Sequence, residues 1–246
     1  MSRVIVLQHV DREGPGLFSK IAIEHQKDVI ISRLYLGESI PNLVDTDLLL
    51  VMGGPMGVWD LNSPNYPWLK KEVEILKFAL ENKIRVIGIC LGAQLLAYAA
   101  GGAVEPLMVG YSKTKKLEVG WAPVNFHNEN DPLNLFEDSK FDVLHWHGDR
   151  AILPPSAEII ASSKICPEQL FCINNLAYGI QFHVEVEEDM ALRWISEDNK
   201  FIHDALGDNA SSILRKQQAE FGKETLSNRL KFINKIFDLL SWNHSS

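Results

Sequence analysis

One stretch, residues 84–100, constrains the fold of this 246-residue chain more than any other. It opens with an apolar, β-branched run over residues 84–89, which is typical of a buried parallel strand. It closes with a second apolar run, residues 95–100, which predicts a helix that Gly101 and Gly102 would end. The stretch therefore predicts a buried strand that turns directly into a helix.

Cys90 lies on the turn between these two elements, with Gly88 and Gly92 two positions to either side. Glycine tolerates strained dihedral angles and lets a substrate approach closely. The free N–H groups and partial positive charge of a helix N-terminus favour a thiolate. This is the arrangement of a nucleophile elbow, with cysteine where α/β-hydrolases place serine. The alternative is a buried structural thiol, which the motif alone leaves open.

Composition bounds the class of protein. The length suits one large α/β domain, or one domain with a helical extension. A net charge of −8 argues against a nucleic acid or an anionic membrane as partner. We expect no bilayer-spanning segment and no signal peptide. An odd number of cysteines, three, indicates a reducing compartment, so we expect a cytoplasmic protein in which Cys166 and Cys172 are structural.

Apolar runs alternate with helical patterns along the first hundred residues. Such alternation predicts a doubly wound sheet with right-handed crossovers. A helix is expected to begin at Ser63-Pro64, with Glu72 among the charged side chains of its solvated face. A first helix is expected to end near residue 26, and strands are expected at residues 3–9, 29–36, 48–52 and 84–89.

The second half of the chain has a different pattern. Shorter strands, antiparallel or mixed at one side of the sheet, are expected at residues 116–126, 141–147, 158–162 and 170–182. Residues 187–242 lack proline and space Leu, Ile and Phe for one packed helical face. We therefore expect an α/β fold with an open, mostly parallel sheet flanked by helices, a mixed β edge and a helical C-terminal tail. Its expected organisation is one domain over residues 1–188 and a helical extension over 189–246 packed on it.

A second motif, YGIQFHVE, occupies residues 178–185. In an extended strand, residues two apart point to the same face, so His183 and Glu185 are expected side by side. A carboxylate beside an imidazole fixes its tautomer and stabilises the imidazolium. Alone, such a pair is more often a surface feature. Together with Cys90 it completes a Cys–His–Glu set.

A glycine-rich loop, Gly53-Gly54-Pro55, follows the third expected strand. Open α/β sheets bind ligands at the carboxyl ends of their strands. The loop matches neither the P-loop nor the GxGxxG pattern. We interpret it as an oxyanion hole, in which the backbone N–H groups of Gly54 and Leu91 are the donors. The alternative is a tight turn.

The motifs GICLGAQ, GGP and QFHVE, all present in this chain, resemble those of the triad-type class I glutamine amidotransferases. The segments EVGW (118–121) and HWHGD (145–149) look like those of the stand-alone, GMP-synthetase-glutaminase-like branch. The resemblance covers residues 3–188 and implies the flavodoxin-like fold of that family. It departs from the family at Val184, where proline is usual, and this substitution leaves the triad residues in place.

The resemblance implies a nucleophile at Cys90, a general base at His183 and an orienting acid at Glu185, with no metal or organic cofactor. It also implies that Gln94 helps to hold the substrate glutamine. Further substrate contacts are expected from Gly53, Trp146, His147 and Asp149.

The HWHGD segment has a rival interpretation as a metal site. His145 and His147 share a strand face and Asp149 follows, so the three could form a His₂-carboxylate set. Trp146 between the histidines, together with the resemblance, favours a pocket wall instead. His9 and the histidines without such context are expected to have surface or packing roles.

The implied reaction is hydrolysis of glutamine to glutamate and ammonia through a γ-glutamyl thioester. Because the chain has no SGGxDS-like loop, the ammonia would go to a synthetase on a separate chain. The alternative is an autonomous γ-glutamyl peptidase acting on glutathione-like compounds. A non-catalytic binding protein is the third interpretation. The sequence leaves open whether the chain forms a homodimer and whether its tail covers or forms a docking surface.

Overall fold

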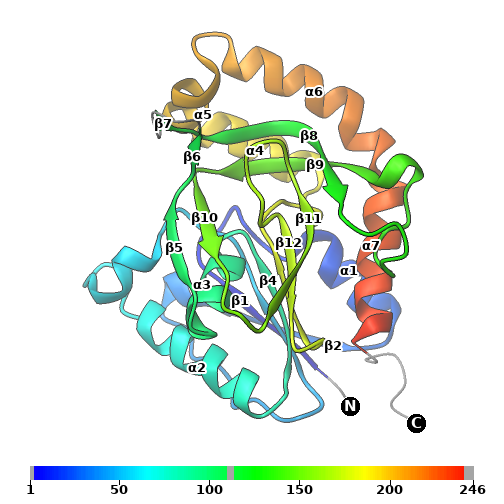
Figure 1. Ribbon diagram of the computed structural model, residues 1–246. Helices are drawn as coiled ribbons and strands as arrows, with labels where there is room; N and C mark the ends of the chain where they lie inside the picture. The colour runs from blue at the N-terminus through cyan, green and yellow to red at the C-terminus, as the bar shows by residue number, and fades with distance from the viewer. Residues whose placement is uncertain (1–2, 110–113, 241–246) are drawn as a thin grey trace.

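The computed structural model describes residues 3–109 and 114–240. Within these ranges, the main sheet has nine strands in the order β2-β1-β3-β4-β13-β12-β11-β8-β9, with helices on both faces (Figure 1). The strands from β2 to β13 pair in parallel, and those from β13 to β9 pair antiparallel. The expected α/β fold, with a parallel central sheet, a mixed edge and flanking helices, is confirmed.

The two longest strands of the sheet lie at its antiparallel edge. The parallel strands are β2 (Asp28–Arg33), β1 (Arg3–Gln8), β3 (Leu48–Val51), β4 (Arg85–Ile89) and β13 (Ala177–Ile180). The antiparallel strands are β12 (Leu170–Ile173), β11 (Ala157–Ser162), β8 (Glu118–Phe126) and β9 (Lys140–His147). Two small ladders pair β5 (Ala103–Pro106) with β10 (Asp149–Ile152) and β6 (Met108–Val109) with β7 (Thr114–Lys115).

Helices cover the sheet in three groups. One face packs on α1 (Gly16–Glu24) and α7 (Leu226–Leu239), and the other on α2 (Leu69–Glu81) and α3 (Leu91–Ala99). A third group packs against β8 and β9 and consists of α4 (Glu188–Glu197), α5 (Asn199–Leu206) and α6 (Ala210–Glu224). Because neighbouring strand residues point to opposite faces, Leu48 and Leu50 enter the first core and Leu49 and Val51 the second.

Two expected boundaries are wrong. The second strand ends at Arg33, and Leu34–Leu36 form a 3₁₀ turn. The second helix begins at Leu69 rather than at Ser63-Pro64, because Pro67 disfavours a helical conformation at the residue before it. A 3₁₀ turn, Val58–Asn62, lies further upstream.

Residues 170–182 form two strands rather than one. Asn174 and Asn175, both with positive φ, make the turn between β12 and β13. The second of these strands joins the parallel side of the sheet, where Ile180 pairs with Ile89 of β4. The chain segment after residue 180 therefore leaves the sheet beside Cys90.

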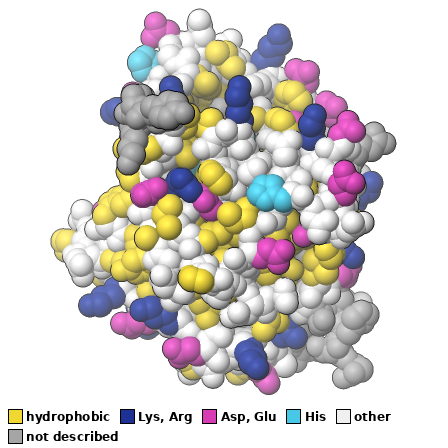
Figure 2. Space-filling model, in the orientation of Figure 1, with side chains coloured by type: hydrophobic (Ala, Val, Ile, Leu, Met, Phe, Trp, Pro, Cys, Tyr) yellow, Lys and Arg dark blue, Asp and Glu magenta, His cyan; other side chains and the backbone are white. Residues whose placement is uncertain are grey.

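The surface carries mixed charge. On the face seen in Figure 2, acidic and basic side chains are interspersed among uncharged ones. Among the described residues, no helix is both long and apolar enough to cross a membrane.

Candidate active site

The elbow at Cys90 has the strained backbone that a strand-to-helix nucleophile turn requires. Cys90 has φ 51° and ψ −103°, between the end of β4 and the first residue of α3. Its N–H donates to the carbonyl of Ile180 at 2.8 Å, which ties the elbow to the end of β13. The strain is therefore at the cysteine itself rather than at the flanking glycines.

The flanking glycines have a different role from the one expected. A Cβ atom on Gly92 would lie 2.1 Å from the carbonyl oxygen of Val51, and one on Gly88 would lie 2.4 Å from the carbonyl oxygen of Gly92. Each position lacks room for any side chain. The two glycines let α3 pack directly on β3 and β4, which brings the N-terminus of α3 close to the carboxyl ends of these strands.

His183 and Glu185 lie side by side, although the segment that carries them is not a strand. It is a bent segment after β13, in which His183 makes a single bridge to Leu144. Nδ1 of His183 lies 2.7 Å from Oε1 of Glu185, and both side chains are about 1% exposed. The backbone carbonyl of Glu185 accepts from the N–H of Leu17 at the start of α1. Helix α1 thus fixes the backbone of the carboxylate-bearing residue.

The electrostatics favour a charged imidazole at this position. Burial by itself would lower the pKa of His183, but the charge of Glu185 and a hydrogen bond with Cys90 raise it well above its usual value. The Cys90 sulfur also lies 3.9 Å from the carbonyl oxygen of Trp146. Cys90 therefore lies beside a hydrogen-bonded His183–Glu185 pair, an arrangement suited to thiolate–imidazolium chemistry.

The glycine-rich loop lies against this set. A Cβ atom on Gly53 would come within 3.3 Å of Cε1 of His183 and 3.5 Å of Cβ of Cys90. The carbonyl of Gly53 turns away and accepts from Nδ1 of His9 at 2.9 Å. Gly53 therefore packs against both His183 and Cys90, and Gly54 and Leu91 line the pocket instead.

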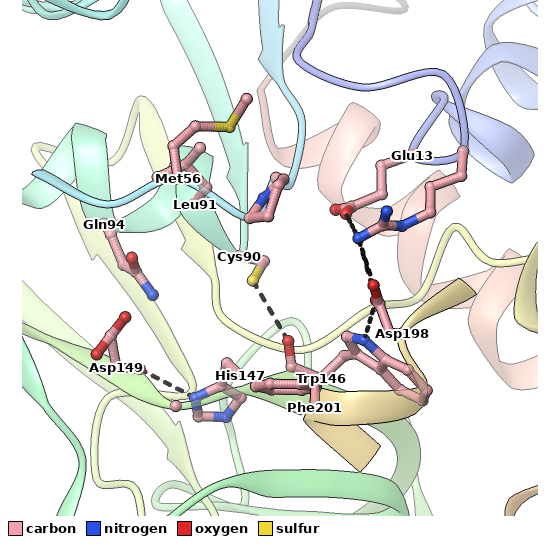
Figure 3. Close-up of a pocket in the computed structure, with 14 residues that line it drawn as sticks. Glu13, Met56, Cys90, Leu91, Gln94, Trp146, His147, Asp149, Asp198 and Phe201 are labelled. Carbon is pink, nitrogen blue, oxygen red and sulfur yellow. Dashed lines mark hydrogen bonds and ion pairs between the residues drawn. The ribbon is translucent and has the colours of Figure 1, made fainter. Parts of the chain in front are cut away.

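A pocket of about 180 Å³ opens above the Cys90 sulfur (Figure 3). Of the expected substrate contacts, Gln94, Trp146, His147 and Asp149 line it, whereas Gly53 does not. Gln94 and Asp149 lie on one side of Cys90 in the close-up, and Glu13 and Asp198 lie on the other. The volume is below the roughly 300–1,000 Å³ typical of drug-sized ligands and suits a small ligand.

His147 makes two polar contacts that the sequence did not reveal. Its Nδ1 donates to the backbone carbonyl of Asp149 at 3.0 Å, and its Nε2 lies 3.0 Å from Oε2 of Glu118. The rival metal interpretation placed the Asp149 carboxylate with the two histidines. In the structure this carboxylate is not part of that group. Glu118, three residues before Trp121 on β8, takes that place beside His145 and His147.

Several pocket residues were not anticipated from the sequence. Arg12 and Glu13 come from the loop after β1, and Asp198 and Phe201 come from the C-terminal helices. Arg12 pairs with Asp198 at 2.8 Å, and Asp198 also accepts from the indole N–H of Trp146 at 3.0 Å. Burial raises the pKa of Glu13, against the opposing charges of His183 and Arg12. No local pattern links these residues, because they come from opposite ends of the chain.

The fold and this site define an α/β protein with a cysteine elbow beside a buried His–Glu pair. The family model for class-I glutamine amidotransferases matches residues 22–195, which is more than half of the chain. The chain therefore belongs to the class I glutamine amidotransferase family.

Individual relatives agree with this assignment. A glutamine amidotransferase-like protein of Salmonella typhimurium is 30% identical over 210 residues, covering 83% of this chain and 84% of the relative. A glutamine-hydrolysing GMP synthase subunit of Methanothrix thermoacetophila is 28% identical over 173 residues, which cover 70% and 84% of the two chains. A solved glutamine amidotransferase of Thermotoga maritima is 27% identical, with a TM-score of 0.81 over 97% of this chain and 98% of its own.

Full GMP synthases match over a smaller part of their length. That of Thermomicrobium roseum is 34% identical over 139 residues, which are 56% of this chain and 23% of the synthase. The matched region is thus about a quarter of a full GMP synthase.

Proposed function

We propose that the chain hydrolyses the side-chain amide of glutamine through Cys90, His183 and Glu185, and that the ammonia passes to a synthetase on a separate chain. One observation carries the proposal. Cys90 lies beside His183, whose Nδ1 is held by Glu185, at the floor of a pocket that the helix N-terminus also reaches.

The chemistry follows from these positions. Because Nδ1 of His183 faces Glu185, Nε2 is left to take the thiol proton. The sulfur attacks the amide carbon, and the N–H groups of Gly54 and Leu91 stabilise the resulting oxyanion. The imidazolium then protonates the departing nitrogen, so that ammonia leaves and a γ-glutamyl thioester remains.

Water completes the reaction. His183 takes a proton from a water molecule, whose oxygen attacks the thioester carbon. The carbon–sulfur bond breaks, glutamate leaves, and the proton on His183 returns to the Cys90 sulfur. No redox equivalent is consumed in either half of the cycle.

The polar end of the pocket supports a fixed orientation for the glutamyl group. Oδ1 of Asp149 is buried and has no hydrogen-bond partner among the described residues. An anionic oxygen in that state suits the α-ammonium group of the substrate. The amide of Gln94, which donates to Gln181 at 3.1 Å, lies on the same side of Cys90 (Figure 3). The leaving group would then point toward Glu13 and Asp198.

The opposite end of the pocket, beside Glu13 and Asp198, favours one alternative function, that of an autonomous γ-glutamyl peptidase. Ammonia needs no pocket beyond the sulfur, yet Arg12, Asp198 and Phe201 extend the pocket there. Phe201 on α5 and Asp198 just before it belong to the C-terminal extension. The extension would therefore take part in choosing the leaving group. The synthetase-linked function draws instead on the relative named as a GMP synthase subunit.

The decisive experiment measures glutamate and ammonia release by the purified chain from glutamine, and glutamate release from γ-glutamyl dipeptides. Turnover of glutamine that rises with an added synthetase would support the first function, and preferred turnover of a dipeptide would support the alternative. Cys90→Ala should abolish both turnover and labelling by a glutamine-analogue electrophile. Cys172→Ala, which removes another buried thiol outside the pocket, should leave both unchanged. Turnover that survives Cys90→Ala would refute the proposed mechanism.

A further inference from the structure

Behind the pocket wall, three side chains from β8 and β9 converge on one point. Glu118, His145 and His147 each offer an atom able to bind a metal, and these atoms lie within 4.8 Å of one another. The strand pairing produces this arrangement, because Glu118 is opposite His147 and Gly120 is opposite His145. Both histidines are buried, and the side chain of Glu118 is 11% exposed.

Backbone carbonyls fix the tautomers of both histidines. Nε2 of His145 lies 3.2 Å from the carbonyl of Ala122, and Nδ1 of His147 lies 3.0 Å from the carbonyl of Asp149. A carbonyl oxygen only accepts, so these two nitrogens carry hydrogens. The other nitrogen of each neutral ring therefore presents a lone pair to Oε2 of Glu118, from 3.7 Å for His145 and 3.0 Å for His147.

Two ring nitrogens and a carboxylate that converge on one point suit a cation. A proton on His147 would satisfy its pair with Glu118 but would leave Nδ1 of His145 buried without a hydrogen-bond partner among the described residues. A single divalent ion would satisfy all three groups.

Gln169 supplies a fourth polar group at the same point. Its Nε2 lies 2.7 Å from Oε2 of Glu118 and 3.2 Å from Nε2 of His147. Its Oε1 is buried without a hydrogen-bond partner in the described part of the chain. Turning the amide by half a rotation would bring that oxygen to the point where the other three groups meet.

We propose that Glu118, His145 and His147 bind a divalent transition-metal ion of the Zn²⁺ class, with the amide oxygen of Gln169 as the fourth ligand. Tetrahedral Zn²⁺ with nitrogen and oxygen ligands separates them by about 3.3 Å, given metal–ligand distances of about 2.0–2.2 Å. The distances of 3.0 and 3.7 Å from Glu118 to the two histidines lie on either side of that value. Metal-binding histidines also characteristically donate their other N–H to a carbonyl or carboxylate.

The site would stiffen the pocket without taking part in the chemistry. His147 and the two residues after it, Gly148 and Asp149, line the pocket. An ion on Nε2 of His147 would fix the end of β9 and the position of the Asp149 carboxylate. The proposal does not depend on the reaction proposed above, because metal uptake is measured without substrate.

The test is metal binding by the full chain after treatment with a chelator. Calorimetric titration with Zn²⁺ should show one ion per chain, and Co²⁺ should give the intense visible absorption of a tetrahedral site. Glu118→Gln and His145→Gln should each weaken binding at least about tenfold, with circular dichroism used to show that they fold. His203→Gln removes an exposed histidine beside Asp208 and should leave the binding unchanged.

Failure of the wild-type chain to bind either ion would overturn the proposal. So would binding that Glu118→Gln leaves intact and His203→Gln removes, since that would place the ion on the surface. Should the buried variants not fold, anomalous diffraction from wild-type crystals grown with Zn²⁺ decides the question. A peak between Glu118 and His147 is expected, and a peak elsewhere would contradict the site.

Discussion

Nε2 of His9 lies 2.8 Å from Oε1 of Glu72, and neither side chain is exposed to solvent. The other ring nitrogen faces the carbonyl of Gly53, so both nitrogens donate and the ring is an imidazolium. Burial alone would lower the pKa of His9, but Glu72 and the Gly53 carbonyl raise it above its usual value. This buried ion pair joins the end of β1 and helix α2 to the loop of the proposed oxyanion hole.

Replacing Glu72 with glutamine should therefore destabilise the protein, by about 3 kcal/mol near pH 6, because it leaves a buried imidazolium without its counter-charge. The pKa of His9 is higher in the folded than in the unfolded chain. The ion pair between His9 and Glu72 therefore contributes its full stabilisation below about pH 6.5. This contribution is lost as the pH rises through the pKa of His9 in the folded state. Denaturant unfolding at several pH values measures this difference.

Glu74→Gln provides the matched control, because Glu74 is exposed two positions away on the same helix. It should change the free energy of unfolding by less than about 0.5 kcal/mol at every pH. The difference in the free energy of unfolding between the wild type and Glu72→Gln should become smaller toward alkaline pH. If this difference stays constant or grows at alkaline pH, His9 is neutral in the folded protein.

Glu185→Gln should lower kcat by roughly 10²–10⁴-fold, less than Cys90→Ala does, because in the proposed mechanism Glu185 orients the base and does not attack the substrate. The Glu185 charge raises the pKa of His183 against the effect of burial. Its removal should therefore move the alkaline limb of the kcat/KM profile to lower pH. A profile that keeps its alkaline limb while activity falls would assign that limb to another group.

Arg229 on α7 links the C-terminal helices to the segment that carries Glu185. Its guanidinium donates to the carbonyls of Val184 and Val186 at 3.3 and 2.5 Å, and to that of Gly222 at 2.8 Å. Arg229→Met should cost roughly 3 kcal/mol of stability, because buried carbonyls lose charged donors. It should also lower kcat by releasing the backbone on both sides of Glu185.

Thermal unfolding and steady-state kinetics measure the two effects of Arg229→Met. Lys231→Met is the control, since Lys231 is exposed on the same helix. That variant should match the wild type in both measurements. Loss of stability in Arg229→Met with an unchanged kcat would mean that α7 supports the fold but not the position of Glu185.

Gly92→Ala should destabilise the protein by about 1–3 kcal/mol, because the new methyl group would collide with the carbonyl of Val51 and move α3 away from the sheet. Displacement of α3 also moves the N–H of Leu91, so kcat should fall more than KM rises. In Gly14→Ala the nearest atom would be Nε2 of Gln8 at 3.7 Å, an ordinary contact. Equal stability of the two variants would show that α3 can shift at little cost.

The elbow and the parallel strands were predictable because their signals are local. A continuous apolar run marks a strand buried on both faces, and Cys90 lies where that run passes into a helical pattern. The close helix–strand contact at Gly88 and Gly92 was not predicted. Helix starts were less predictable, as the start at Leu69 shows, because proline placement competes with periodicity. The solvated role expected for Glu72 is wrong, since helical spacing does not reveal a buried partner 63 residues away.

The sequence by itself determined the order of strands and helices and the position of Cys90 at a strand-to-helix turn. It also determined that His183 and Glu185 lie next to each other. Each of these features depends on neighbours within a few residues. Only the tertiary structure decided which side chains meet across the sheet. It placed Glu118 rather than Asp149 with the two histidines, and Asp198 with Arg12 across the pocket. Such contacts depend on strand register and helix packing between distant segments, and no local pattern of residues encodes them.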